Sequence, residues 1–176
     1  QRELKKRGNS VPYEMTYLKG GLLEKYLRDI QVVQEFAELN RYAILDELAK
    51  GMKWKIQEQI TSVHNYIDDT GDNMILRKGA ISAGEEEPVI IPINMRDGIL
   101  LGVGKGNADW NYSAPHGAGR KMKREEVKTR YTVSQFKTEM KGIYSSCIGK
   151  DTLDEAPFAY RNRKEIEEQI GDTVEI

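Results

Sequence analysis

The sequence predicts an α+β fold, in which a helical N-terminal segment is followed by a mixed or antiparallel sheet with flanking helices. Three observations support this class. Apolar residues recur at spacings of three and four between residues 22 and 60, short β-branched runs occupy residues 62–103, and helical patterns return after residue 122. Helices and strands that are separated along a chain are typical of α+β proteins. The length of 176 residues suits one domain, 1–176.

The first part of the chain is expected to be helical. Residues 1–10 are polar and basic, and Gly8 interrupts them, which predicts a helix end followed by a loop. The apolar periodicity then continues for almost forty residues. Because glycine weakens a helix interior, Gly51 predicts two helices, at about 22–50 and 52–60, instead of one.

The middle of the chain is expected to form strands. Strand-like runs cover 62–67, 74–76, 80–82, 89–93 and 99–103, and an acidic turn at 68–72 separates the first two. Pro92 cannot donate a hydrogen bond to a ladder. It therefore limits its strand to the edge of a sheet or to a strand end.

The last part returns to helices. The patterns predict a helix over 122–128, another with Thr132 or Ser134 as its N-cap, a short turn capped by residues 152–154, and a helix over 163–170 that Gly171 ends. The chain begins with Gln1 instead of Met and stops in the strand-like 173–176. We therefore expect a fragment of a longer protein.

Composition narrows the class of function. The formal net charge is −1, so nucleic-acid binding would have to come from a local basic patch. No apolar run approaches the roughly 20 residues of a membrane span, so no membrane partner is expected. The single cysteine, Cys147, rules out an internal disulfide framework and is typical of a reducing compartment, which predicts a cytoplasmic protein.

The stretch from Asn111 to Arg120 holds His116, one of two histidines in the sequence. It is too rich in proline and glycine for a helix interior or a strand. Gly117 and Gly119 allow close approach of a ligand to the backbone, and Arg120 offers a planar donor for phosphate or carboxylate. The pattern predicts an imidazole on a phosphate-binding turn. A surface turn that happens to hold a histidine is the competing interpretation.

Other side chains could complete such a site. His64 is a metal-ligand candidate, although a histidine in a strand is more often a core residue. Lys78 follows Arg77 before a glycine, where the two cations could reach phosphate or form a solvated turn. A basic patch could surround His116, from Lys105, Arg120, Lys121, Lys123 and Arg124. Stacking surfaces or a packed core could come from Trp110, Tyr112 and Tyr160.

These residues resemble a known family. The stretch from Tyr112 to Arg120, YSAPHGAGR, followed by Met122 and Arg124, is similar to the signature of the RtcB family of RNA ligases. Further motifs agree in order: HNY at 64–66, RKGA at 77–80 with Ser82, IP at 91–92, Gly104 with GN at 106–107, EAPFAY at 155–160, and Tyr17–Leu18, Ala37 and LNR at 39–41 in the helical segment. The resemblance spans nearly the whole chain and implies the RtcB-like fold.

The family's activity is therefore the expectation for this protein. RtcB ligases join RNA 3′-phosphate or 2′,3′-cyclic-phosphate ends to 5′-hydroxyl ends with GTP and Mn²⁺, in RNA repair or tRNA splicing. The resemblance implies that His116 is the nucleophile that attacks the α-phosphorus of GTP and carries GMP. Arg120 and the amides of Gly117, Ala118 and Gly119 would steady phosphate oxygens.

The resemblance also implies a nucleotide and metal site. His64 matches a manganese ligand, Lys78 an active-site lysine near phosphate or RNA, and Tyr160 the tyrosine that stacks on guanine. Asn94 replaces one of the serines that hold the nucleotide in many members, and Ile99 stands where another is expected.

Several family features are missing from these residues. In members of the family, the remaining metal ligands lie in the N-terminal half of the sequence, and a lysine that contacts guanine lies in a C-terminal tail. Cys147 follows the nucleophile and is expected to be a buried structural thiol. The isolated 176 residues are therefore expected not to ligate RNA. The RNA substrate and any activating protein partner stay open.

Two alternatives to the ligase remain. One is a non-catalytic RNA- or nucleotide-binding relic of an RtcB-like ligase. The other is an enzyme that transfers a nucleotidyl group through the same histidine to an acceptor other than RNA.

Overall fold

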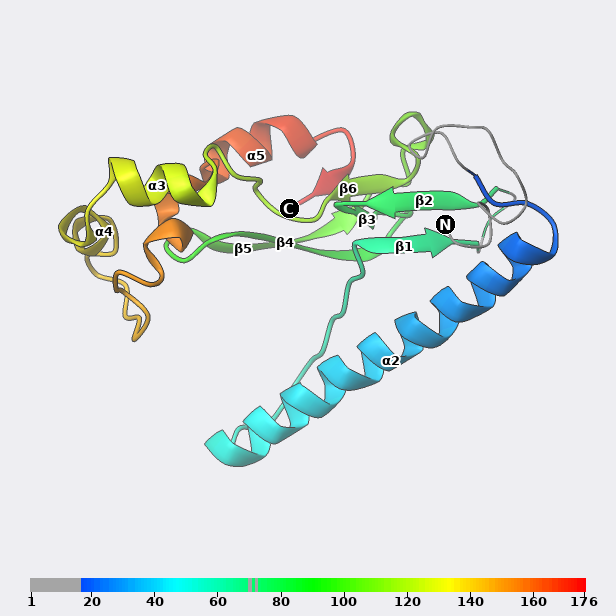
Figure 1. Cartoon of the computed structure of the whole chain (residues 1–176), viewed down its shortest axis with the longest axis horizontal. Coiled ribbons are helices and arrows are strands. Elements are labelled where there is room, and N and C mark those ends of the chain that lie inside the picture. The colour runs from blue at the N-terminus through cyan, green and yellow to red at the C-terminus, as the bar shows by residue number, and fades with distance from the viewer. Residues whose placement is uncertain (1–16, 70, 72) are drawn as a thin grey trace, which may run out of the picture. The chain divides into compact units, whose positions relative to one another are not determined.

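The computed structural model describes residues 17–69, 71 and 73–176 (Figure 1). The helix end and loop predicted for residues 1–10, and positions 70 and 72 of the predicted acidic turn, lie outside the described residues. The chain divides into two compact units, 1–56 and 57–176, and each is described by itself. The expectation of a single domain stays a prediction.

The described part of the first unit is dominated by one helix, α2, which spans Gly21–Met52. The helix continues through Gly51, so the predicted break there is wrong, as is the second helix predicted over 52–60. A glycine costs only about 1 kcal/mol in a helix interior. The helix ends where Lys53 takes a left-handed conformation with φ 56°.

Backbone hydrogen bonds close this end of α2. The Lys53 amide donates to the Lys50 carbonyl at 3.2 Å, and the Trp54 amide donates to the Ala49 carbonyl at 2.8 Å. These bonds satisfy carbonyl groups that have no partner within the helix. Position 53, and not the glycine before it, therefore ends the helix.

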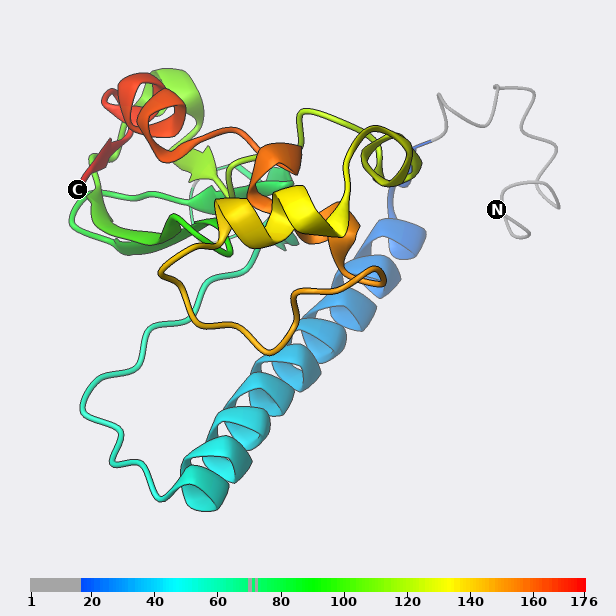
Figure 2. The ribbon, with the colours of Figure 1, turned by 90° about the vertical axis from the view of Figure 1, so that its left-hand side faces the viewer.

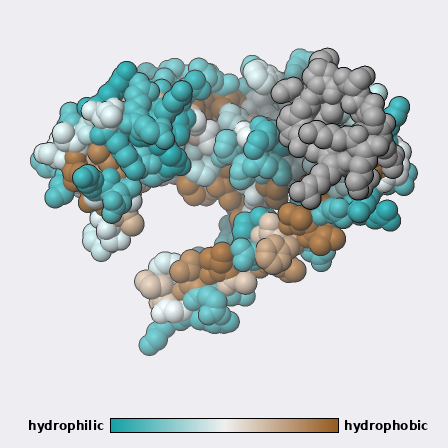
Figure 3. All heavy atoms as spheres, in the orientation of Figure 1, coloured by the Kyte–Doolittle hydropathy of each residue, from teal (hydrophilic) through white to brown (hydrophobic). Residues whose placement is uncertain are grey.

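Many apolar side chains of α2 are exposed, and hydrophobic residues are visible along the helix in Figure 3. The exposed set includes Val32, Val33, Phe36, Leu39, Ile44 and Leu48. Ala49 is the buried residue of the helix. Among the described residues, none of the helices combines the length and apolarity needed to cross a bilayer.

The described residues of the second unit form three small antiparallel sheets. They pair β1 (Asn65–Asp68) with β2 (Ile75–Lys78), β3 (Ala80–Ser82) with β6 (Ser113–Pro115), and β4 (Pro88–Asn94) with β5 (Gly98–Gly104) and β7 (Val174–Glu175). The predicted strands are thus confirmed with small shifts in their bounds, and every described pairing is antiparallel.

The largest sheet has the order β4-β5-β7, so β4 is an edge strand. Pro92 lies in it opposite Ile99, with a register shift just beyond, which confirms the prediction made for this proline. Val174 pairs with Gly104, so the strand-like C-terminal residues do form a strand.

The main core lies between this sheet and α5 (Arg163–Ile170), which lies above the sheet in Figures 1 and 2. Residues of β4 alternate between buried and outward-facing positions, as expected for a strand with one covered face. The buried cluster contains Ile81, Ala83, Val89, Ile91, Ile93, Leu100, Ala114, Ala118, Ile166, Ile170 and Val174.

Two of the remaining described helices begin at a capping box. Helix α3 spans Arg124–Arg130, two residues later than predicted, and α4 spans Val133–Glu139. Thr132 is the N-cap of α4 and forms a capping box with Gln135, which confirms one of the two proposed caps. Short 3₁₀ turns follow, η3 (Leu153–Glu155) and η4 (Pro157–Ala159), and α5 matches its predicted bounds.

Candidate active site

His116 directly follows strand β6, which pairs with β3 through Ala80 and Pro115. The expectation that this stretch could not contain a strand is therefore wrong for residues 113–115. Their sheet has only two strands, so Pro115 can lie at the end of the ladder without removing an internal hydrogen bond. The glycine-rich turn begins after His116, where Gly119 has φ +72°.

The His116 ring is oriented by the turn between β2 and β3. Its Nδ1 atom lies 2.6 Å from the carbonyl oxygen of Gly79. Gly79 has φ +70°, which favours glycine, and its amide donates to the His64 carbonyl at 2.9 Å. Because a carbonyl only accepts hydrogen bonds, this contact requires a proton on Nδ1, which leaves the lone pair of the neutral ring on Nε2.

The second histidine lies against the first. The rings of His64 and His116 are stacked, with centroids 4.9 Å apart and an interplanar angle of 9°. His64 precedes the first residue of β1, Asn65, and is exposed, so it is not the core histidine of the competing interpretation. The two imidazoles that the sequence singled out therefore form one pair.

The cations at 77 and 78 play different parts. Lys78 is exposed, and its Nζ donates to the Asn65 side chain at 3.1 Å. Arg77 is only 3% exposed. Its side chain is therefore not available to bind phosphate together with Lys78, as the sequence had suggested. Its guanidinium pairs with Asp68 at 2.5 Å, and it also donates to the Ser113 hydroxyl at 3.2 Å and to the Tyr112 carbonyl at 3.2 Å. Arg77 is thus a buried tie between β2 and β6.

A cavity of about 810 Å³ brings most of the predicted site together. Its walls include the two histidines, the glycine-rich turn and apolar residues of β4 and β5. Of the site residues predicted from the sequence, it contains His64, Asn94, His116, Gly117, Ala118, Gly119, Arg120 and Tyr160. Lys78 is not among its lining residues. A volume of this size suits a nucleotide-sized ligand.

The glycine-rich turn packs closely on β4. The Ala118 amide donates to the Pro92 carbonyl at 3.0 Å, and a Cβ on Gly117 would lie 3.1 Å from the same oxygen. The Ala118 amide is therefore already used within the protein and does not join the amides expected to hold phosphate. The amides of Gly117 and Gly119 remain the candidates.

Arg120 is surrounded by partners from the 154–160 segment. Its guanidinium donates to the Tyr160 hydroxyl at 2.9 Å, lies 3.4 Å from a Glu155 carboxylate oxygen, and donates to the Asp154 carbonyl. It also lies 4.9 Å from the centre of the Tyr160 ring. The predicted anion clamp thus has an internal carboxylate beside it.

Glu155 is a member of this site that the sequence interpretation missed. Burial raises the pKa of its carboxyl, but hydrogen bonds from Tyr160 and Arg124 outweigh it and keep the pKa below its ordinary value of 4.5. Burial and the Glu155 carboxylate in turn raise the pKa of the Tyr160 hydroxyl. The EAPFAY motif contained the signal, since it places Glu155 and Tyr160 together, but it did not indicate the partnership with Arg120.

The expected basic patch is largely neutralised. Arg124 pairs with Asp154 at 2.6 Å and also with Glu155, and Lys121 pairs with Glu165 at 2.8 Å. The hydrogen bond from Arg124 is the main cause that lowers the pKa of Asp154. Arg120, Lys121 and Arg124 therefore have carboxylate partners, which reduces the net positive charge of the patch.

Two further expectations have clear outcomes. Cys147 is exposed, so it is not the buried structural thiol that was predicted. Trp110 and Tyr112 are 55% and 46% exposed, which places neither in a packed core. Their exposure keeps the stacking role open.

Asn94 lies at the turn between β4 and β5. Its side-chain oxygen accepts from the Arg96 amide at 3.0 Å and from the Asp97 amide at 2.9 Å, and its amide nitrogen donates to Asp97 at 2.9 Å. This ties the side chain to its own turn. Asn94 is thus a rigid polar group in the cavity wall.

The described residues do not complete a metal site. No group of three or more His, Cys, Asp or Glu side chains suited to a metal ion occurs within 17–69, 71 and 73–176. His64 and His116 supply imidazole nitrogen, a good ligand for transition metals, but two such groups fall short of a full set.

Comparisons with known proteins place this arrangement in context. A family model described as tRNA-splicing ligase RtcB matches residues 2–175. The RNA-splicing ligase RtcB of Escherichia coli K12 is 28% identical over 196 residues, which cover all of this chain and 47% of that protein. The tRNA-splicing ligases RtcB of Aeropyrum pernix and Nanoarchaeum equitans are 31% and 30% identical, over 87% and 81% of this chain and 38% and 37% of theirs. The chain spans less than half the length of these relatives.

Proposed function

The chain belongs to the RtcB family, and from this premise we propose that it carries the nucleophile of a GTP-dependent RNA ligase. The ligase joins RNA 3′-phosphate or 2′,3′-cyclic-phosphate ends to 5′-hydroxyl ends, in RNA repair or tRNA splicing. The observation that carries this proposal is the contact of His116 Nδ1 with the Gly79 carbonyl at 2.6 Å, because it leaves Nε2 as the nucleophilic atom at a nucleotide-sized cavity.

In the first step, His116 Nε2 attacks the α-phosphorus of GTP. A P–N bond forms, the bond from the α-phosphorus to the bridging oxygen breaks, and pyrophosphate leaves with the bonding electrons. The ring becomes positively charged while Nδ1 keeps its proton. The Gly79 carbonyl oxygen then faces that charge and stabilises it, since a hydrogen bond to a charged donor is stronger than one to a neutral donor.

In the next steps, a 3′-phosphate oxygen of the RNA attacks the same phosphorus and the P–N bond breaks, which returns His116 to its neutral form. The 5′-hydroxyl oxygen of the second RNA end then attacks the 3′-phosphorus, loses its proton and displaces GMP. A histidine suits this relay because a phosphoramidate forms and breaks more easily than a phosphate ester. Arg120 and the amides of Gly117 and Gly119 would hold the phosphate oxygens.

The guanine is proposed to lie in the 810 Å³ cavity between Tyr160 and Asn94. Tyr160 packs partly against the main core and has Arg120 4.9 Å from its ring centre, and the base would stack on the part of the ring that lines the cavity. Lys78, on β2 beside Gly79, would act as a point charge for phosphate or RNA at the edge of the site.

We also propose that the whole enzyme uses Mn²⁺, with His64 as one ligand. The described residues do not fit a complete metal site. The other ligands would come from a part of the protein that corresponds to the regions of the relatives outside the match with this chain. The exposed free thiol of Cys147 agrees with a reducing compartment, and we place the enzyme in the cytoplasm.

A second candidate is a binding relic without ligase activity. The observation that favours it is the pairing of Arg120 and Arg124 with Glu155, which neutralises the cations nearest the proposed phosphate site. Such a protein would bind RNA or nucleotide but form no bond to GMP.

Labelling with α-³²P GTP tests the proposal. The chain, combined with the complementary half of a relative and Mn²⁺, should retain acid-labile label, and His116→Ala should lose it. Glu168→Gln, on the exposed side of α5, is the control and should label normally. Label that persists in His116→Ala would show that another residue is the nucleophile. RNA binding without any label in the parent protein would favour the relic.

A further inference from the structure

A second cavity shares His116 and the glycine-rich turn with the first. Its volume is about 630 Å³, and it is lined by residues 116–119 together with parts of β6, α5 and the loop before β6. We propose that this cavity binds the 3′-terminal nucleotide of the RNA, with the base on Trp110 and the terminal phosphate on Arg161. The proposal rests on the proposed function, because it assigns a place to the second substrate of the same histidine.

The charge of this cavity favours an anion. Among the described residues that line it, Arg161 is the only permanently charged side chain, and none is a carboxylate. The first cavity differs, because Glu155 lies in its wall beside Arg120. A terminal phosphate entering the second cavity would meet a cation without a competing carboxylate in the wall.

Arg161 is fixed beside the shared turn. Its amide donates to the Gly119 carbonyl at 3.2 Å, and its guanidinium lies 4.0 Å from the point that a Cβ on Gly119 would occupy. The nearby carboxylate of Glu165 is paired with Lys121 at 2.8 Å. The guanidinium of Arg161 thus lies next to the turn that carries His116.

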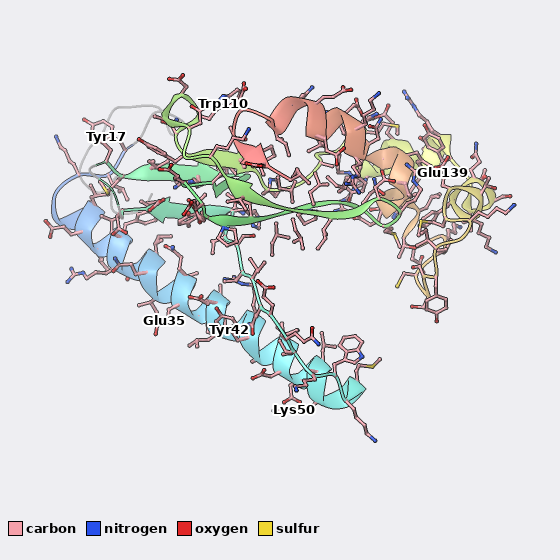
Figure 4. All side chains as sticks on the ribbon, turned by 180° about the vertical axis from the view of Figure 1, so that it is seen from behind. Tyr17, Glu35, Tyr42, Lys50, Trp110 and Glu139 are labelled. Carbon is pink, nitrogen blue, oxygen red and sulfur yellow. The ribbon has the colours of Figure 1, made fainter. Side chains whose placement is uncertain are left out.

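Trp110 offers a rigid aromatic surface. It ends the 3₁₀ turn η2 (Ala108–Trp110) on the loop between β5 and β6, as Figure 4 shows, and it is 55% exposed. Asn107 holds this loop: its side chain accepts from the Asp109 amide at 3.0 Å and donates to the Asp172 carbonyl at 3.0 Å. The loop is therefore tied to the end of the chain, and the indole is held at the cavity by fixed backbone.

The combination matches a single-stranded RNA end. Aromatic side chains bind bases of any sequence by stacking, and arginine matches the geometry of a terminal phosphate. Ligation requires a nucleotide and an RNA end at one histidine, and two cavities with a common wall can hold them without overlap. Both cavities reach His116, so the 3′-phosphate in one would meet the GMP phosphorus held from the other.

Fluorescence of Trp110 tests the site directly. The chain has two tryptophans, so Trp54→Phe leaves Trp110 as the only reporter. A short RNA with a 3′-phosphate should change this fluorescence in a saturable way. The same RNA with a 3′-hydroxyl should bind roughly tenfold more weakly, because it lacks the group that Arg161 holds.

Two variants and two matched controls complete the experiment. In anisotropy titrations with labelled RNA, Trp110→Leu and Arg161→Met should weaken binding of the 3′-phosphate RNA by about 10- to 100-fold. Arg161→Met should also remove the preference for the 3′-phosphate. Tyr144→Leu, at an aromatic residue that is 93% exposed, and Arg163→Met, at an arginine paired with Glu167, should bind as the parent does.

GTP labelling of His116 separates this inference from the proposed function. If the parent labels, and both cavity variants bind RNA normally, the RNA site is wrong and the proposed ligase stands. If RNA binds through Trp110 and Arg161 but His116 never labels, the RNA site stands and the ligase is wrong. If GMP displaces the RNA from Trp110, the cavity is a nucleotide site and the inference is overturned.

Discussion

His116 Nδ1 lies 2.6 Å from the carbonyl oxygen of Gly79, a residue 37 positions earlier in the chain. The contact fixes the proton of the neutral imidazole on Nδ1. ¹⁵N NMR of the histidine rings should therefore show a protonated Nδ1 and an unprotonated Nε2 for the neutral form of His116. His64→Gln simplifies the spectrum to one histidine. A proton found on Nε2 would contradict the orientation of the ring and the choice of nucleophilic atom.

Arg77→Met should be strongly destabilising. The substitution leaves Asp68 without its buried partner and removes the bonds from β2 to Ser113 and to the Tyr112 carbonyl. Loss of one member of a buried ion pair costs about 3–5 kcal/mol of unfolding free energy. Urea denaturation measures the loss. Lys78→Met, at the exposed neighbour, should change stability by less than about 0.5 kcal/mol, and equal effects of the two variants would refute the buried tie.

Glu155→Gln should increase the affinity for GTP. The substitution removes the carboxylate charge that lies 3.4 Å from Arg120, so Arg120 becomes available to phosphate, while Arg124 keeps its pair with Asp154. One fewer opposing charge at this range is expected to tighten binding by about fivefold to tenfold. Titration with a fluorescent GTP analogue measures it, and Asp151→Asn, at an exposed carboxylate, is the control. Weaker binding in Glu155→Gln would show that the carboxylate positions the arginines instead of competing with phosphate.

Acid should destabilise the second unit. The pKa values of Asp97, Asp154, Glu155 and Glu165 all lie below their ordinary values of 3.8 and 4.5. A carboxyl with a lowered pKa in the folded protein contributes stability above its unfolded pKa, and this is lost as the pH falls through the folded value. The unfolding free energy should thus be nearly constant above about pH 5 and fall below it. Glu155→Gln should reduce this slope, and a stability that rises on acidification would contradict the assignment.

Gly104→Ala should damage the β5 end of the large sheet. A Cβ at this position would lie 2.3 Å from the Gly84 carbonyl oxygen and 2.5 Å from the Ala83 carbonyl carbon, both of which are backbone atoms. The backbone must shift, at a cost of about 3 kcal/mol. Thermal and urea unfolding measure this loss. The control is Gly149→Ala, whose Cβ meets no atom within 4 Å, and its unfolding free energy should be nearly unchanged. An equally stable Gly104→Ala would mean that the backbone at 104 does not contact the backbone at 83–84.

Elements with local signals could be predicted from the sequence. The bounds of α5 follow from its amphipathic pattern and its end at Gly171, and the cap of α4 follows from the spacing of Thr132 and Gln135. The edge position of β4 follows from Pro92, which lacks an amide proton. Each of these depends on residues a few positions apart, which a single sequence contains.

Relationships between distant residues could not be predicted in this way. The helix expected over 52–60 is absent because the backbone turns left-handed at Lys53, which no apolar pattern indicates. The pairing of Arg120 with Glu155 joins residues 35 positions apart, and it converts an expected free cation into a neutralised one. The resemblance identified His116, but the carbonyl that orients its ring depends on how β2, β3 and β6 pair, and spacing does not encode that pairing.

The division of the chain near residue 56 has a practical consequence for engineering the protein. Every residue assigned to nucleotide, RNA or metal in this chain, from His64 to Arg161, is encoded within the second unit. A single gene segment for residues 57–176 therefore encodes all of these assigned residues. Replacing this segment with that of a relative leaves the sequence of α2 unchanged. Chimaeras made at this boundary would therefore show which properties depend on the site residues and which depend on the helix.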